Sequence, residues 1–154
     1  MRVFVVRDLC LLLATTTLWA LDWHTGDAWQ QALLGGMTGL LAYESHEWGH
    51  YLGARLGEAR IDTPSAWWSP FLFGFDPQQN SRRAFVQMTW PGFVATLAYL
   101  GAFAWLLPNE GLTSAIAWAI ATLLAGITLF VEVPILLWGL SGRRLSPRIR
   151  VPLP

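Results

Sequence analysis

A His-Glu-x-x-His motif inside a long apolar segment constrains this chain more than any other feature. His46, Glu47 and His50 lie between Trp29 and Arg55, a stretch long enough for a membrane-spanning helix. Residues four apart on a helix point in nearly the same direction and lie about 6 Å apart along its axis, so both imidazoles can reach one metal ion. The pattern predicts a zinc site with His46 and His50 as ligands and Glu47 as the catalytic general base.

The alternative to a metal site is a buried polar cluster that only joins helices together. Ionisable side chains at the centre of a bilayer cost about 2.5 to 3.5 kcal/mol each on insertion scales, and those that occur there usually have a function. We therefore favour the metal site over a purely structural cluster.

The composition is typical of a polytopic membrane protein. Hydrophobic residues make up 54% of the 154 residues and charged residues 13%, and the formal net charge is zero. This balance predicts one domain over residues 1–154, embedded in a lipid bilayer, with no nucleic acid as a partner. The single cysteine excludes an intramolecular disulfide and a zinc site built from several cysteines.

Four apolar segments predict an all-α integral membrane fold with four transmembrane helices. We expect the helices at about 3–22, 29–55, 84–107 and 112–140, with a loop at 56–83 and a basic tail at 141–154. A signal peptide is the rival interpretation of the first segment, but Leu18-Trp19-Ala20 lacks the two small residues that a cleavage site needs. We interpret this segment as a transmembrane helix that packs outside the other three.

The placement of arginine predicts the orientation. All ten basic residues are arginines, and with four spans they fall on the side that holds the N-terminus, the 56–83 loop and the C-terminus. By the positive-inside rule this side is cytoplasmic, which predicts cytoplasmic termini in a plasma or inner membrane. The aromatic core of the loop, at 66–75, predicts either an interfacial anchor or a strand that contacts substrate.

Three features of the helices share one depth. At 1.5 Å per residue, His46, Pro91 and Glu132 each lie about 12 to 16 Å from the nearest inner-face arginine of their own helix. Pro91-Gly92 predicts a kink or a local opening of its helix, and Glu132 is the one acid of the last helix. We therefore expect the histidines, the kink and the acid to meet in the cytoplasmic half of the membrane.

These residues resemble the site-2 protease family of intramembrane zinc metalloproteases. The likeness covers nearly the whole chain, as a minimal core without a PDZ domain. Only the His/Glu motif is specific, and the other matches support it by their order and position. In chain order, all the matching features are the His46-Glu47-x-x-His50 helix running to Gly53-Ala54-Arg55, the loop end Phe73-Gly74-Phe75-Asp76-Pro77, the Pro91-Gly92 break, and Gly142-Arg143-Arg144 after a last helix with a proline and an acid.

The chain departs from this family at the third zinc ligand. The family uses an aspartate in a Leu-Asp-Gly sequence, whereas residues 135–142 contain no aspartate. We predict that Glu132 replaces it, because a carboxylate oxygen serves zinc in either residue. The alternative is that Glu132 lines the substrate cavity and the site is incomplete. The remaining candidates for substrate or cavity contacts are Glu44, Pro91, Gly92 and Pro134.

The resemblance implies a zinc-dependent endopeptidase that cleaves a transmembrane protein or peptide within or near its membrane segment. The missing Leu-Asp-Gly leaves open a proteolytically inactive relative that binds or regulates membrane helices. A metal transporter is disfavoured, because a transport path needs polar residues through both leaflets and the outer halves of these segments are nearly apolar. The oligomeric state is left open, since the glycine faces of the helices can pack within or between chains.

Overall fold

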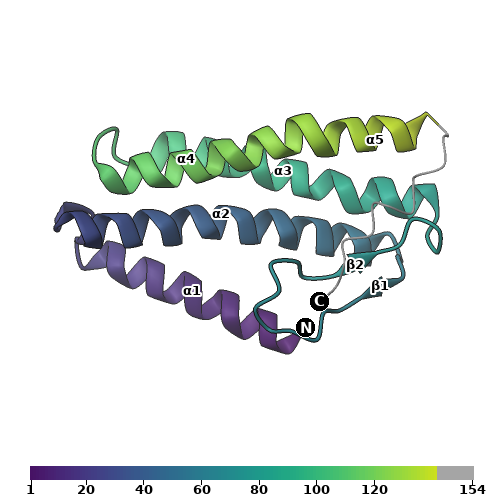
Figure 1. Ribbon diagram of the computed structural model, residues 1–154, viewed down its shortest axis with the longest axis horizontal. Coiled ribbons are helices and arrows are strands. Elements are labelled where there is room, and N and C mark those ends of the chain that lie inside the picture. Colours follow the sequence, from purple (N-terminus) through teal and green to yellow (C-terminus); the bar gives the residue numbers. More distant parts are fainter. Residues whose placement is uncertain (142–154) are drawn as a thin grey trace.

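The computed structural model describes residues 1–141, which form an almost wholly helical arrangement (Figure 1). From residue 142 onward, the predicted basic tail lies outside the described residues, and so does the Gly142-Arg143-Arg144 match. The structure has helices over all four predicted ranges. In chain order the elements are α1 (Arg2–Ala20), the short 3-10 helix η1 (Trp23–Thr25), α2 (Ala28–Leu56), β1 (Ile61–Asp62), β2 (Gly74–Phe75), α3 (Arg82–Leu106), α4 (Leu112–Ile127), the π-helical segment η2 (Thr128–Glu132) and α5 (Val133–Leu140).

Helix α2 is the centre of the fold. It packs against α3 and α4 on one side, and α1 lies along it on the other side (Figure 1). The approach of α2 to α3 requires glycine, because a Cβ at Gly53 would lie 2.1 Å from the backbone oxygen of Gln87. Pro91 has no N–H to offer that carbonyl within α3. The helix nevertheless continues through Pro91. The opening predicted there is therefore limited to the Gln87 carbonyl, which lacks its partner within α3 and lies against Gly53 of α2.

Local sequence sets the starts of the long helices. Asp27 and Gln30 form a capping box at the start of α2, with hydrogen bonds of 3.1 and 2.9 Å between each side chain and the other's backbone N–H. Ser81 accepts the Ala84 N–H at 3.1 Å before α3. Gly111 has a φ of 106° before α4, a conformation that favours glycine. Because of these caps, α2 and α3 begin slightly earlier than predicted.

The last predicted helix is continuous but not uniform. α4, η2 and α5 follow one another without a loop from Leu112 to Leu140, in agreement with the predicted range of 112–140. The sequence predicted one helix with a proline in it and gave no sign of the π-helical turn at Thr128–Glu132. Pro134, in the first turn of α5, lacks the N–H that would continue regular pairing. Such wide turns occur mostly as single insertions in α-helices, often at functional sites.

The loop between α2 and α3 adds a small β element to the predicted all-α fold. Strands β1 and β2, of two residues each, pair in antiparallel fashion. Backbone groups in a partly buried loop need partners, and this pairing supplies them. Trp67 and Trp68 are 59% and 67% exposed, whereas Leu72 and Phe73 are buried. The loop thus has outward tryptophans and a short strand pair, and both predicted roles, an interfacial anchor and a substrate-contacting strand, stay predictions.

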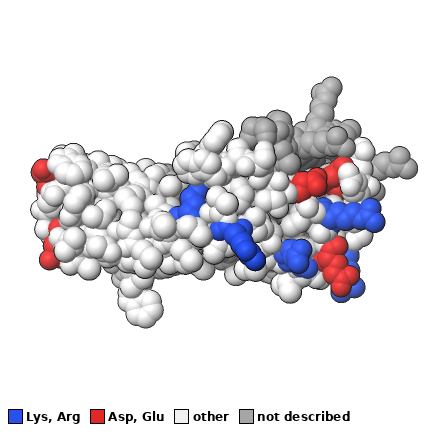
Figure 2. Space-filling view, turned by 90° about the horizontal axis from the view of Figure 1, so that it is seen from below, with Lys and Arg blue, Asp and Glu red and all other residues white. Residues whose placement is uncertain are grey.

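Charged residues gather toward the two ends of the molecule. Figure 2 shows basic side chains from the middle of this face to one end, acidic side chains at both ends, and uncharged surface between the middle and the opposite end. The described arginines belong to the start of α1, the end of α2, the loop and the start of α3 (Arg2, Arg7, Arg55, Arg60, Arg82 and Arg83), and the turns at the opposite end carry Asp22, Asp27 and Glu110. Within the described part of the chain, two helical segments are long and apolar enough to cross a membrane, Arg2–Ala20 and Leu112–Leu140.

Candidate metal centre

The two histidines of the motif lie on successive turns of α2 and face the same point. His46 is 1% exposed and His50 is 9% exposed. Their ring centroids are 4.4 Å apart, the ring planes are close to perpendicular at 87°, and the two Nε2 atoms are separated by 2.9 Å. The spacing of four residues thus produces the convergence of imidazoles that the sequence predicted.

Helix α3 fixes the other nitrogen of each ring. Nδ1 of His46 lies 3.1 Å from the carbonyl oxygen of Gly92 and 2.8 Å from Oγ1 of Thr96. Nδ1 of His50 lies 3.0 Å from the carbonyl oxygen of Met88. A carbonyl oxygen can only accept, so Nδ1 carries a proton in both rings. In the neutral form each ring then directs an Nε2 lone pair toward the other.

Glu132 completes the group from the last residue of η2. Its Oε1 lies 3.1 Å from Nε2 of His46, and its Oε2 lies 3.7 Å from Nε2 of His50. Oε2 is buried and has no hydrogen-bond partner among the described residues. The carboxylate therefore reaches both histidines and keeps an unsatisfied oxygen beside them.

This donor set fits a metal ion. One ligand atom from each of His46, His50 and Glu132 lies within 4.8 Å of the others. With neutral imidazoles, two lone pairs and a carboxylate face one another without a proton between them, an arrangement that a cation would stabilise. If a histidine is protonated, the same contacts become ion pairs. The group could thus hold a metal ion, and the Nδ1–H contacts are compatible with both states, because a protonated imidazole also carries a proton on Nδ1.

A cavity of about 200 Å³ opens beside this group. Glu47, His50 and Glu132 border it, and half of the remaining lining residues are aromatic, namely Phe71, Phe73, Phe75 and Phe85. Glu47 thus shares a small, mostly apolar space with two of the three candidate ligands. The motif places the carboxylate on α2, and the loop after α2 encloses it.

Gly92 permits the approach of His50 to α3. A Cβ at this position would lie 2.2 to 2.5 Å from three atoms of the His50 ring. No rotamer change of residue 92 can relieve this overlap, because the Cβ position is fixed by the backbone. The imidazole would have to move, and it would lose its contact with the Met88 carbonyl.

We expect Gly92→Ala to weaken metal binding by about tenfold or more and to destabilise the fold by about 1 to 3 kcal/mol, since it both displaces a ligand and overpacks the interface. Metal titration and thermal unfolding of the purified protein would measure the two effects. Gly101→Ala is the matched control, because Gly101 is on the same helix and a Cβ there meets nothing within 4 Å. Equal metal affinity in Gly92→Ala and the unmodified protein would contradict the placement of His50.

The other predicted cavity residues have different positions. Gly92 contacts both histidines as described, and the Pro91 carbonyl packs against Gly49, where a Cβ would lie 2.6 Å away. Pro134 is exposed and acts on the backbone beside Glu132. Glu44 does not border the cavity of Glu47; it pairs with Arg7 of α1 at 2.8 Å and lines a separate cavity between α1, α2 and α3.

Sequence reasoning missed the groups that orient the two histidines. Thr96 lies four residues after Gly92, so its place on the face of the predicted break could have indicated it. The Met88 and Gly92 carbonyls carry no such signal, because every residue has one. The loop residues that border Glu47 were predicted to be an interfacial anchor or a substrate-contacting strand, but their contact with the motif depends on how the loop folds back.

Searches with this chain found no matching protein family, no matching curated protein and no matching solved structure.

Proposed function

We propose that the chain is a zinc-dependent intramembrane endopeptidase that hydrolyses a peptide bond within or near a membrane segment of its substrate. The observation that carries this proposal is the joining of His46, His50 and Glu132 into one group that borders a cavity shared with Glu47. Two imidazoles and one carboxylate are a ligand set that catalytic zinc sites use, with a further position left for the reaction.

Membrane insertion is supported by the surface as well as by helix length. Large apolar side chains on several helices face outward: Leu13 is 64% exposed, Trp105 is 89% exposed and Phe130 is 77% exposed. Exposed apolar surface of this kind marks contact with a membrane or a partner. We propose four spans formed by α1, α2, α3 and the α4–α5 segment, with the N-terminus and the α2–α3 loop on the cytoplasmic side, as the arginines indicate.

The chain's own residues account for the proton transfers of hydrolysis. A zinc ion held by His46, His50 and Glu132 would supply a Lewis acid beside the scissile carbonyl. The Glu47 carboxylate would take a proton from the attacking water and return it to the leaving amine. The Thr96 hydroxyl and the α3 carbonyls hold the imidazoles in one tautomer, and the phenylalanines of the loop limit access of bulk water.

Metal removal tests the proposed function directly. Protein purified in detergent should contain about one zinc per chain and cleave at least one member of a panel of tagged single-span membrane proteins. Treatment with 1,10-phenanthroline should abolish cleavage, and added zinc should restore it, because the ligands must hold the metal for hydrolysis. Folded protein that binds no zinc, or cleavage that survives the chelator, would count against the proposal.

A second candidate function is supported by one contact. The 3.1 Å separation of His46 Nε2 and Glu132 Oε1 also suits an ion pair that closes the site without metal. A chain of that kind would bind or regulate membrane helices without cleaving them. Zinc content separates the two candidates, since the ion-paired form predicts none.

A further inference from the structure

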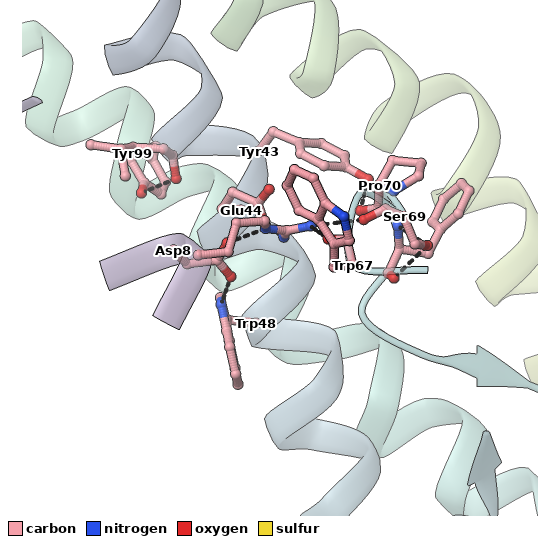
Figure 3. A network of polar contacts seen from close by, with 11 residues as sticks. Asp8, Tyr43, Glu44, Trp48, Trp67, Ser69, Pro70 and Tyr99 are labelled. Carbon is pink, nitrogen blue, oxygen red and sulfur yellow. Dashed lines mark hydrogen bonds and ion pairs between the residues drawn. The ribbon is translucent and has the colours of Figure 1, made fainter. Parts of the chain in front are cut away.

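Arg7 and Asp8 are a charged pair within a largely apolar helix, and the proposed chemistry uses neither. Residues 2–20 form one of the two segments apolar enough to cross a membrane. Charged side chains in such segments are costly and usually have a specific partner. The structure supplies partners from α2 and from the loop, and Figure 3 shows Asp8 beside Glu44, with the loop residues Trp67, Ser69 and Pro70 nearby.

The guanidinium of Arg7 joins α1, α2 and the loop at one point. Its Nη2 donates to Oε2 of Glu44 at 2.8 Å, and its Nε donates to Oδ1 of Asp8 at 2.6 Å. Its Nη1 donates to the carbonyl oxygens of Ser69 and Trp67, at 2.8 and 3.3 Å. Arginine suits this role because its planar fork can bond several acceptors at once.

Neighbouring contacts hold the same segment of the loop. The Tyr43 hydroxyl donates to the carbonyl oxygen of Pro70 at 2.6 Å, from the residue before Glu44. Ser69 is fully buried, and its hydroxyl bonds both the N–H and the carbonyl of Phe71, at 3.2 and 2.9 Å. Residues 67–70 are thereby fixed against α2, one turn before the His-Glu motif.

The residues that follow this fixed segment form the wall of the cavity beside Glu47. Phe71 and Phe73 line that cavity, and Leu72 between them is fully buried with its backbone amide against the Glu47 carboxylate. Movement of residues 67–70 would therefore carry the wall with it. Arg7 bonds one end of this short stretch, at residues 67 and 69, and the other end, at residues 71 and 73, lines the cavity.

We propose that Arg7 is a positioning residue that holds loop residues 67–73 over the candidate active site. The inference rests on the proposed function only where it treats Glu47 as the catalytic base. Loss of the guanidinium would leave two loop carbonyls without their donor and Glu44 without its counter-ion. The loop would then open more often, and the site would become accessible to solvent and to reagents.

The test is the reactivity of a thiol placed in the loop of the full chain. In a Cys10→Ser background, which removes the exposed native cysteine, Ser69→Cys reports opening of the loop. Ser114→Cys reports general loosening, because Ser114 is also buried, 4% exposed, but lies in α4. Maleimide labelling is measured for both thiols with Arg7 unchanged and with Arg7→Gln, Arg7→Lys or Arg2→Gln.

We expect Arg7→Gln to raise labelling at the Ser69→Cys thiol by about tenfold or more, since it removes the hydrogen bonds that hold the closed loop. Labelling at the Ser114→Cys thiol should stay within about twofold, because α4 does not depend on these bonds. Arg7→Lys should give an intermediate rate, as lysine keeps the charge opposite Glu44 but not the fork. Arg2→Gln should change nothing, because Arg2 is exposed on the same helix.

Unchanged labelling at Ser69→Cys in the Arg7→Gln chain would overturn the proposal, and so would an equal rise at Ser114→Cys. If Arg7→Gln fails to fold, Arg7→Lys decides, because it loses the fork that bonds the loop carbonyls and should give a smaller, selective rise, whereas no rise also overturns the proposal. The rate at which zinc-loaded protein loses zinc to a chelator supplies a second readout. Arg7→Gln should increase this rate. A chain that binds no zinc but shows the selective labelling would contradict the proposed function and leave the role of Arg7 intact.

Discussion

Glu47→Gln should lower peptide hydrolysis by about 10²- to 10⁴-fold, the range that a general base contributes, while the zinc content stays at that of the unmodified protein. Glutamine has nearly the same shape, but its amide cannot take a proton from water at neutral pH. Glu47 borders the cavity and is not part of the group formed by His46, His50 and Glu132. Removal of its charge should therefore affect the reaction and spare the metal.

Cleavage of a tagged membrane substrate and metal analysis of the same sample measure this difference. Glu110→Gln makes the same chemical change in an exposed turn between α3 and α4, so it should leave both quantities unchanged. A Glu47→Gln chain that cleaves as fast as the unmodified protein would assign the base to another group. A chain that also loses zinc would place Glu47 among the ligands.

Glu132→Ala should weaken zinc binding by at least about 100-fold, because it removes one of the three candidate ligands and the only carboxylate among them. Activity should be lost with the metal. Glu132→Asp keeps the carboxylate on a shorter side chain and should retain part of the zinc. Comparison of the two variants separates the need for a carboxylate from the need for a side chain long enough to reach both histidines. The Glu132 oxygens lie 3.1 Å from Nε2 of His46 and 3.7 Å from Nε2 of His50.

Zinc per chain after dialysis against a weak chelator measures these variants, and Glu110→Gln again controls for loss of a carboxylate far from the site. Full zinc in Glu132→Ala would move the third ligand to another residue. It would also favour the interpretation of Glu132 as a cavity residue. Zinc loss in Glu132→Ala together with retention in Glu132→Asp would support the replacement of the expected aspartate by glutamate.

The predicted helices follow from properties that are local in the chain. Apolar runs of about 20 residues, a capping box at Asp27 and Gln30, and glycine before α4 specify where helices begin and end. The depth comparison placed Glu132 beside the histidines because rise per residue is nearly constant along a helix. That estimate needed only three counts along the chain, and the structure brings Glu132 together with His46 and His50.

The surroundings of the site depend on how separate segments meet. The carbonyls of Met88 and Gly92 fix the imidazoles, but every residue has a carbonyl, so the sequence offers no means of choosing them. The π-helical segment before Pro134 aims Glu132, and a proline alone does not specify which distortion a helix adopts. The position of Leu72 beside Glu47 likewise depends on the fold of a loop with little periodic pattern.

The sequence by itself determined the helical segments, the paired imidazoles and the acid at their depth, because helical spacing and hydrophobic length act through near neighbours in the chain. Tertiary structure alone decided that Glu44 pairs with Arg7 rather than joining the site, and that Arg7 bonds the loop carbonyls. These contacts span from 37 to 62 positions along the chain. Partners so far apart are selected by the packing of α1, α2 and the loop, and a one-dimensional pattern does not contain that packing.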